Sequence, residues 1–255
     1  FFVVYTGIML LLLQSFQLIS EVVESGIGKT TSFMTAFIPT YATTLLLSGN
    51  TASAGSFYGL AFGIVYVLEL AMKFLFIPGV HIYVLLVLLD HLFEESKLSK
   101  FAELFESGIY LALKVGLAVV MGMGVVQSLI APAKDRLSVS SLYQGFKAVP
   151  GVGNSFGAAG ELLVGCTIMI KNSMGAAALL VLVILGLEPV LKVLCFHVMY
   201  RLASAVLQPF CDKRLAESIA GMGKGCGIYL KIMWNALLLF FLTISMIAAS
   251  TGFIN

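Results

Sequence analysis

The sequence predicts an all-α, polytopic membrane protein, and three observations lead to that prediction. Of the 255 residues, 60% are hydrophobic and only 11% are charged, whereas about a quarter of the residues in a typical soluble domain are charged. The uncharged residues form long continuous runs. These runs do not alternate polar and apolar side chains as barrel strands do, so each run is predicted to be a helix. This composition excludes both a soluble globule and a disordered chain.

The uncharged runs define eight segments that can cross or enter a bilayer, since about 20 apolar residues span about 30 Å of hydrocarbon. The segments are 1–20, 30–47, 54–77, 80–89, 115–133, 161–187, 190–208 and 232–250. The fourth is short enough to be re-entrant, so the expected count is seven or eight transmembrane or re-entrant helices. The turn-forming cluster at 48–51 separates the second segment from the third, and Pro189 separates the sixth from the seventh.

Residues 97–113 are predicted to form an amphipathic helix ahead of the fifth segment. Apolar residues recur there at three- and four-residue spacing, with Lys100 and Glu103 between them. Such a helix can lie on the membrane, pack on a partner, or be the wet end of a long span. We therefore expect one helical membrane domain, with N-terminal helices in 1–128, a Gly/Pro-containing connection in 129–160 and C-terminal helices in 161–255.

The distribution of lysine and arginine orients the eight-segment arrangement, because cytoplasmic loops carry an excess of both. The even-numbered loops hold only Lys97 and Lys100. The odd-numbered loops hold Lys29, Lys134, Arg136, Lys147, Lys213, Arg214, Lys224 and Lys231. This asymmetry predicts that the odd loops are cytoplasmic and that both termini lie outside.

Ionisable residues inside the segments are the first candidate site, because charges are costly in hydrocarbon. Glu69 and Lys73 lie four residues apart on one helix face, and Glu188 and Lys192 repeat this order, which favours ion pairing. Arg201 follows nine residues after Lys192. The charges form either a polar path or inter-helix pairing site inside the bundle, or a device that only fixes helix register.

Regularly spaced glycines are the second candidate feature. Gly55, Gly59 and Gly63 lie four residues apart in the third segment. The same spacing recurs near the C-terminus in Gly221 and Gly225 and in Gly223 and Gly227. Small residues let helices approach closely, so these positions are predicted to pack helices within the chain or in a homo-oligomer.

Residues 149–160 are the third candidate feature. Pro150 is followed by Gly151, Gly153 and Gly157, and this composition favours non-helical backbone. We expect a loop or broken-helix entry packed against the bundle, with Asn154 directed at backbone or at a neighbouring subunit. The alternative is a cytoplasmic surface loop.

No catalytic, cofactor or metal site is predicted. The run 26–30 resembles the end of a phosphate loop, but Val23 stands where that loop requires glycine. The four cysteines and three histidines lack metal-ligand spacing. A net charge of +2 does not point to nucleic acid. We therefore expect a non-enzymatic protein; a secondary transporter with helices broken near Pro150 and Pro189 is the alternative.

Several short motifs, in their order and spacing, resemble the stage III sporulation protein AE family of endospore-forming bacteria. They are Ile38-Pro39, Ser48-Gly49-Asn50, Ala148-Val149-Pro150-Gly151-Val152-Gly153-Asn154, Ile170-Lys171-Asn172-Ser173-Met174-Gly175, Glu188-Pro189-Val190-Leu191-Lys192 and Leu207-Gln208-Pro209-Phe210-Cys211-Asp212-Lys213-Arg214. The resemblance covers most of the chain and is densest between about 140 and 215.

The resemblance implies a membrane subunit of a secretion-like channel complex between mother cell and forespore, located in the mother-cell membrane around the forespore and needed for late forespore gene expression. The implied partners are the other products of the stage III sporulation A operon, including a secretion-type ATPase and a ring-forming protein, and a channel partner from the forespore. Family members carry a signal peptide and an extracytoplasmic stretch before the membrane region, which agrees with a first residue that is not Met. The resemblance brings no catalytic residue.

Overall fold

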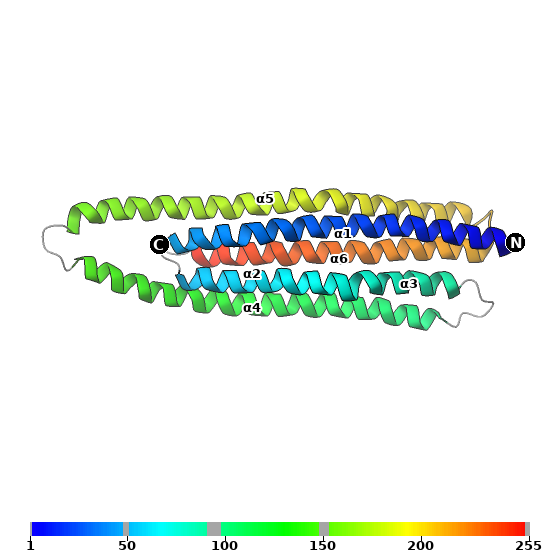
Figure 1. The fold of residues 1–255 in the computed structure, drawn as a ribbon, viewed down its shortest axis with the longest axis horizontal. Helices are drawn as coiled ribbons and strands as arrows, with labels where there is room; N and C mark the ends of the chain where they lie inside the picture. Colours follow the sequence, from blue (N-terminus) through cyan, green and yellow to red (C-terminus); the bar gives the residue numbers. More distant parts are fainter. Residues whose placement is uncertain (1, 48–50, 91–97, 148–152, 253–255) are drawn as a thin grey trace. The chain divides into compact units, whose positions relative to one another are not determined.

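The computed structural model describes the backbone of residues 2–47, 51–90, 98–147 and 153–252, and the side chains of 6–47, 54–90, 98–126, 169–170 and 173–245. Every regular element in these ranges is a helix (Figure 1). The elements are α1 (Phe2–Leu47), α2 (Thr51–Ala71), the π-helical turn η1 (Met72–Phe76), α3 (Ile77–Asp90), α4 (Ser99–Lys147), α5 (Gly153–Leu207) and α6 (Lys213–Gly252). The all-helical prediction is confirmed.

The predicted count of seven or eight segments is not confirmed. In the described residues, five stretches are long and apolar enough to cross a membrane: Thr6–Leu47, Ala54–Asp90, Ser99–Val126, Ser173–Leu207 and Lys213–Ser245. Three pairs of predicted segments are each joined into one helical stretch. With five such stretches the chain is a membrane protein.

The joined segments show that charges and prolines do not end these helices. Glu21 and Glu24 lie within α1, and Pro189 lies within α5. A carboxylate on a helix surface leaves the backbone hydrogen bonds intact. Proline removes one hydrogen bond, which membrane helices tolerate when neighbouring helices pack against the site. From Ser99 onward the predicted amphipathic helix is likewise the first part of α4, so it is the end of a long span.

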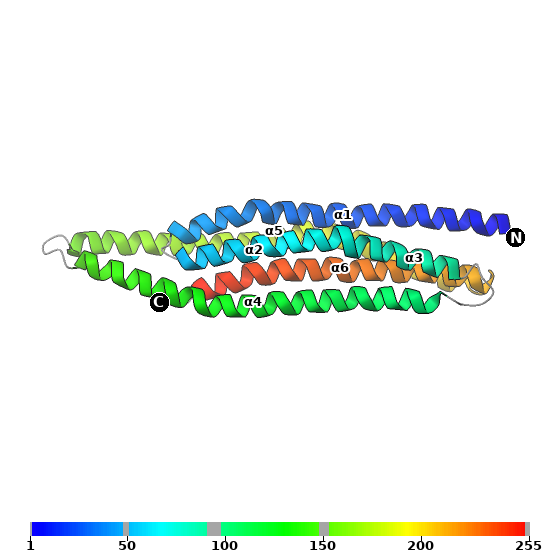
Figure 2. The ribbon, with the colours of Figure 1, turned by 60° about the horizontal axis from the view of Figure 1, so that its bottom comes forward.

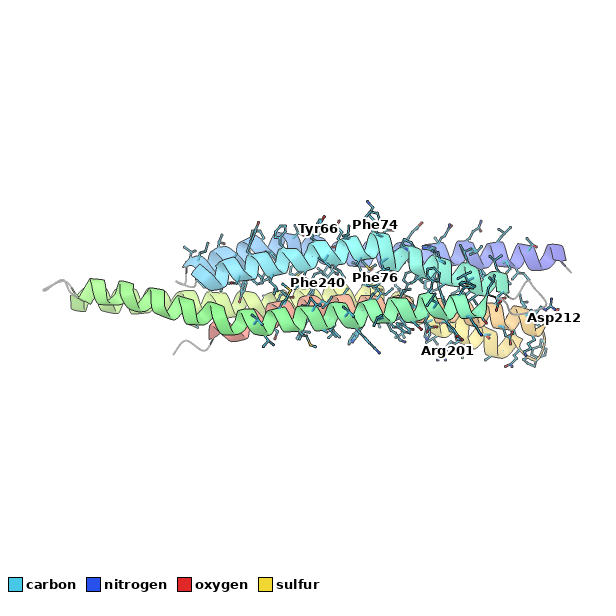
Figure 3. The ribbon with its side chains drawn as sticks, turned by 90° about the horizontal axis from the view of Figure 1, so that it is seen from below. Tyr66, Phe74, Phe76, Arg201, Asp212 and Phe240 are labelled. Atoms are coloured by element: carbon cyan, nitrogen blue, oxygen red, sulfur yellow. The ribbon has the colours of Figure 1, made fainter. Side chains whose placement is uncertain are left out.

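The turn η1 joins α2 to α3 without ending the helix. The N–H of Ile77 bonds to the carbonyl of Met72, five residues back. Pro78 follows directly, and its ring cannot sit against the carbonyl four residues earlier, so a wider turn relieves the clash. Phe76 is buried at 4% exposure, whereas Phe74 is 68% exposed and points outward (Figure 3).

The contacts divide the chain into two compact units. Unit 1 consists of Phe1–Thr30, Val67–Leu117 and Ile184–Leu237, and unit 2 of Thr31–Tyr66, Ala118–Val183 and Leu238–Asn255. The helices α1, α2, α4, α5 and α6 each contribute residues to both units.

Unit 1 is built around the first part of α6 (Figure 2). Tyr229 of α6 forms a 3.0 Å hydrogen bond with Ser20 of α1, and its ring stacks on Phe16 with centroids 5.4 Å apart. On another side, the ammonium of Lys231 lies 3.9 Å from the ring centroid of Tyr110 in α4. The first part of α6 therefore contacts both α1 and α4.

Unit 2 has an aromatic core. Tyr41 of α1 meets Phe57 of α2 edge to face, with ring centroids 5.1 Å apart, and Phe37 stacks on Tyr41 at 5.2 Å. Thr44 donates a hydrogen bond to the sulfur of Met174 in α5 at 3.3 Å. These contacts hold parts of α1, α2 and α5 together.

The outward surfaces of both units are apolar. Leu11 and Phe74 in unit 1 are exposed, as are Tyr66 and Leu180 in unit 2. Trp234, the one tryptophan of the sequence, is 59% exposed on α6. Lipid tails or the apolar surfaces of other proteins favour such surfaces, and water does not.

A charged cleft as the candidate functional site

A cleft between α1 and α5 in unit 1 gathers charged side chains from both helices. It has a volume of about 300 Å³ and is lined by Leu18, Glu21, Val22, Ser25, Gly26, Lys29, Glu188, Pro189 and Lys192. The α1 residues recur every three or four positions, which places them on one helix face. Two carboxylates and two ammonium groups therefore line one space, and their formal charges cancel.

The close approach of Gly26 and Pro189 brings α1 and α5 together at this cleft. A Cβ added at Gly26 would lie 2.6 Å from the Cβ of Pro189 and 2.7 Å from its Cγ, much closer than carbon atoms pack. The carbonyl of Gly26 accepts a 2.9 Å hydrogen bond from the hydroxyl of Thr30. The absence of a side chain at Gly26 thus makes room for the Pro189 ring.

Among the described side chains, two of the four charged groups in the cleft form an ion pair with each other. The ammonium of Lys192 donates to a carboxylate oxygen of Glu188 at 2.6 Å, and each side chain is more than half exposed. Lys29 lies within electrostatic range of Glu188. Among the residues whose side chains are described, no ion pair engages Glu21 or Lys29. One carboxylate and one ammonium group therefore remain available in the cleft.

Sequence reasoning identified the α5 half of this cleft and missed the α1 half. Glu188 and Lys192 were predicted to pair, either in a polar path or pairing site inside the bundle or as a device that only fixes helix register. The pair forms on the exposed face of α5, so its position does not match a path inside the bundle. The neighbouring Val193 is fully buried and takes the inward face. The charges of α1 that interrupt two long uncharged runs, Glu21 and Lys29, were the available signal.

Arg201 also lies on the surface of unit 1 and not in its interior (Figure 3). Its Cγ lies 3.5 Å from the position of a Cβ added at Gly223 of α6. Its aliphatic stem therefore packs near α6, while the side chain as a whole is exposed.

Glu69 and Lys73 do not form the predicted ion pair. Both are exposed, and the ammonium of Lys73 lies 5.8 Å from the ring centroid of Phe74. The turn η1 begins at Met72, between the two residues. A π-turn has more residues per turn than an α-helix, so positions four apart no longer face each other.

The glycines of α2 do not pack helices within the described chain. A Cβ added at Gly55, Gly59 or Gly63 would meet no atom within 4 Å. All three face outward because Ala54, Phe57 and Leu60 occupy the buried face of α2. The prediction of intramolecular packing is wrong for this stripe, and contact with a second copy stays a prediction.

The glycines of α6 do pack against neighbouring helices. A Cβ at Gly221 would collide with Val87 of α3, and one at Gly225 would lie 2.6 Å from Val84. Gly227 faces the ring of His197 in α5 instead, at 3.1 Å. Alternate glycines of α6 therefore allow close packing against α3 on one side and against α5 on another.

The structure contradicts the predicted irregular backbone over much of 149–160. The helix α5 begins at Gly153, so the backbone is helical through Gly157 and Gly160. Helical hydrogen bonding here overrides the weak preference of single glycines for other conformations. Pro150 and Gly151 lie outside the described residues, as does the side chain of Asn154.

A set of polar contacts inside unit 1 was also missed by sequence reasoning. Ser15 of α1 and Tyr200 of α5 form a 2.5 Å hydrogen bond. The Nδ1 of His197 lies 2.7 Å from the carbonyl oxygen of Gly223. A carbonyl oxygen can only accept, so Nδ1 carries the hydrogen and donates it. Isolated hydroxyls and rings leave no periodic signal in a sequence.

Within the described part of the chain, no three His, Cys, Asp or Glu side chains are grouped to hold a metal ion.

Comparison with known proteins gives one family. The family model described as stage III sporulation protein AE matches residues 1–251. The stage III sporulation protein AE of Bacillus subtilis (strain 168) is 24% identical over 246 residues, which cover 96% of this chain and 62% of the relative. The chain thus spans under two thirds of that relative's length. No solved structure matches. Because the family model covers nearly every residue, the chain belongs to the stage III sporulation protein AE family.

Proposed function

We propose that the chain is a non-enzymatic membrane subunit of a secretion-like channel complex that links mother cell and forespore during endospore formation. The observation that carries the proposal is the family match over residues 1–251 in a chain with five apolar helices long enough to span a membrane. The proposed location is the mother-cell membrane around the forespore, and the proposed role is support of late forespore gene expression.

The length of α1 supports a role as one subunit among several. The apolar stretch Thr6–Leu47 has 42 residues, which is about 63 Å of helix and roughly twice the hydrocarbon thickness. The length that exceeds the bilayer still exposes apolar residues, including Leu10 and Leu11 at 58% and 65%. Other proteins can cover this surface. We propose the other products of the stage III sporulation A operon, among them the secretion-type ATPase and the ring-forming protein, and the forespore channel partner.

The structure offers less support for a small-solute transporter. Transporters of that kind hold substrate where helices are interrupted near the bilayer midplane. Within the described residues, α5 continues as a helix through Pro189, and the cleft beside it opens on the outer face.

The test is made in a sporulating strain in which the full-length protein containing this chain is the sole copy. We expect deletion of the gene to abolish a late forespore reporter while an early forespore reporter stays active. We expect a tagged copy, cross-linked during sporulation, to co-purify the operon products. Normal late forespore expression in the deletion strain would overturn the proposal.

A further inference from the structure

We propose that the cleft between α1 and α5 binds the head group of an aminophospholipid of the phosphatidylethanolamine class. Three features of the cleft support this assignment: its level relative to the hydrocarbon, the chemistry of its free groups, and the surface that adjoins it. The proposal does not depend on the function proposed above.

The level of the cleft follows from the charges that flank the uncharged stretches. Directly after Lys29, residues 30–47 of α1 are uncharged, and directly before Glu188, residues 172–187 of α5 are uncharged. These stretches correspond to about 27 Å and about 24 Å of helix, close to the thickness of the hydrocarbon layer. A more than half-exposed ion pair on an outer face cannot lie in that layer without a large cost. The cleft therefore lies where the helices leave the hydrocarbon.

The other long helices support the same assignment. In α2 the uncharged residues 51–68 end at Glu69, in α4 residues 115–133 begin after Lys114, and in α6 residues 232–250 begin after Lys231. Each stretch is about one hydrocarbon thickness long.

The free groups of the cleft match a head group with one negative and one positive charge. The ammonium of Lys29 is the phosphate ligand, and the hydroxyl of Ser25, one turn away on the same face, is a second donor. The carboxylate of Glu21 accepts hydrogen bonds from the ammonium of the lipid. The choline head group has no N–H to donate, so this carboxylate discriminates against phosphatidylcholine. Glu188 and Lys192 form the opposite wall of the cleft and pair with each other, so neither engages Glu21 or Lys29 in an ion pair.

The surface next to the cleft suits an acyl chain. Ile184 lies one turn before Glu188 in α5 and Leu187 lies directly before it, and their side chains are 69% and 50% exposed. They extend an apolar path from the charged cleft along the uncharged stretch of α5. A soluble phosphate or amino acid would leave this path uncovered, whereas a phospholipid covers it.

The experiment is native mass spectrometry of the full chain in detergent, titrated separately with phosphatidylethanolamine and with phosphatidylcholine of the same acyl chains. The variants are Lys29→Gln and Glu21→Gln. The matched controls are Lys114→Gln and Glu24→Gln, which change the same charges at exposed positions that do not line the cleft. All four positions are exposed, so folding is preserved in each variant.

We expect wild type and controls to retain phosphatidylethanolamine in preference to phosphatidylcholine. Each cleft variant should bind phosphatidylethanolamine about tenfold more weakly, the loss typical of one charged hydrogen bond. Equal retention by cleft variants and controls would overturn the site. Equal retention of the two lipids would overturn the role of Glu21, and displacement by millimolar inorganic phosphate would assign the cleft to free phosphate.

Discussion

At the residue scale, Gly26→Ala tests the contact that holds α1 against α5. A Cβ at this position would lie 2.6 Å from Pro189 Cβ, and proline has no other rotamer with which to move away. We expect the melting temperature in detergent to fall, with a loss of about 1–3 kcal/mol of stability.

The control for this variant is Gly28→Ala. Position 28 has no atom within 4 Å of an added Cβ, and alanine favours a helix over glycine by about 1 kcal/mol. Gly28→Ala should therefore melt at or above the wild-type temperature. Identical melting of the two variants would show that Gly26 and Pro189 are not in close contact.

The second residue-scale prediction concerns Tyr229→Phe. This change removes the hydroxyl that bonds Ser20 at 3.0 Å and keeps the ring that stacks on Phe16. Ser20 is 6% exposed, so its hydroxyl loses its partner in a buried position. We expect a loss of about 1 kcal/mol, measured by thermal unfolding. Tyr58→Phe, at a 45% exposed position on α2, should leave stability unchanged; a loss as large there would point to a general effect of removing a hydroxyl.

At the element scale, the packing of α6 against α3 depends on alternate glycines of α6. In Gly225→Ala the added Cβ meets Val84 at 2.6 Å and Phe16 at 3.1 Å. Valine is stiff and buried, so the helices must separate, and we expect a stability loss of about 1–3 kcal/mol.

The neighbouring Gly223→Ala is the matched control on the same helix. Its added Cβ would lie 3.4 Å from Tyr200 and 3.5 Å from Arg201, which is ordinary contact. We expect Gly223→Ala to unfold near the wild-type temperature. A larger loss in Gly223→Ala than in Gly225→Ala would mean that α6 is rotated from the orientation described above.

The helical class and several helix ends could be predicted from the sequence because both depend on local chemistry. The turn-forming residues at 48–51 mark the boundary between α1 and α2, which end and begin at Leu47 and Thr51. The joining of two predicted segments into one helix could not be predicted, since a surface carboxylate such as Glu21 is compatible with a loop and with a continuous helix. Half of the cleft was missed for a different reason: Lys29 and Glu188 are brought together only by the packing of α1 on α5.

At the scale of the whole molecule, five described stretches that are long and apolar enough to cross the membrane, in place of eight, change the expected topology. Eight segments placed the loops near Arg136 and Arg214 on the same side of the membrane. With five crossings, only α5 passes through the bilayer between the end of α4 and the start of α6. Positions at the end of α4 and the start of α6 should therefore lie on opposite sides.

Single cysteines at Ser138 and at the exposed Lys213, in a chain without its own cysteines, test this topology. We expect a membrane-impermeant maleimide added to intact cells to label one position and leave the other protected. Permeabilised cells supply the control, because both positions should then react. Equal labelling or equal protection of the two positions in intact cells would show that they lie on the same side of the membrane, which contradicts a single crossing between them.

The exposed Trp234 is an intrinsic fluorescent probe of membrane depth. No other tryptophan occurs in the 255 residues, so the emission of the chain reports on this one position of α6 without any engineering. Trp234 follows Lys231 by three residues, at the depth where indole rings gather in membrane proteins. Lipids brominated at successive acyl carbons would quench its emission according to distance. Fluorescence from this chain, without substitutions, can thus measure how deeply the segment of α6 near Lys231 lies in the bilayer.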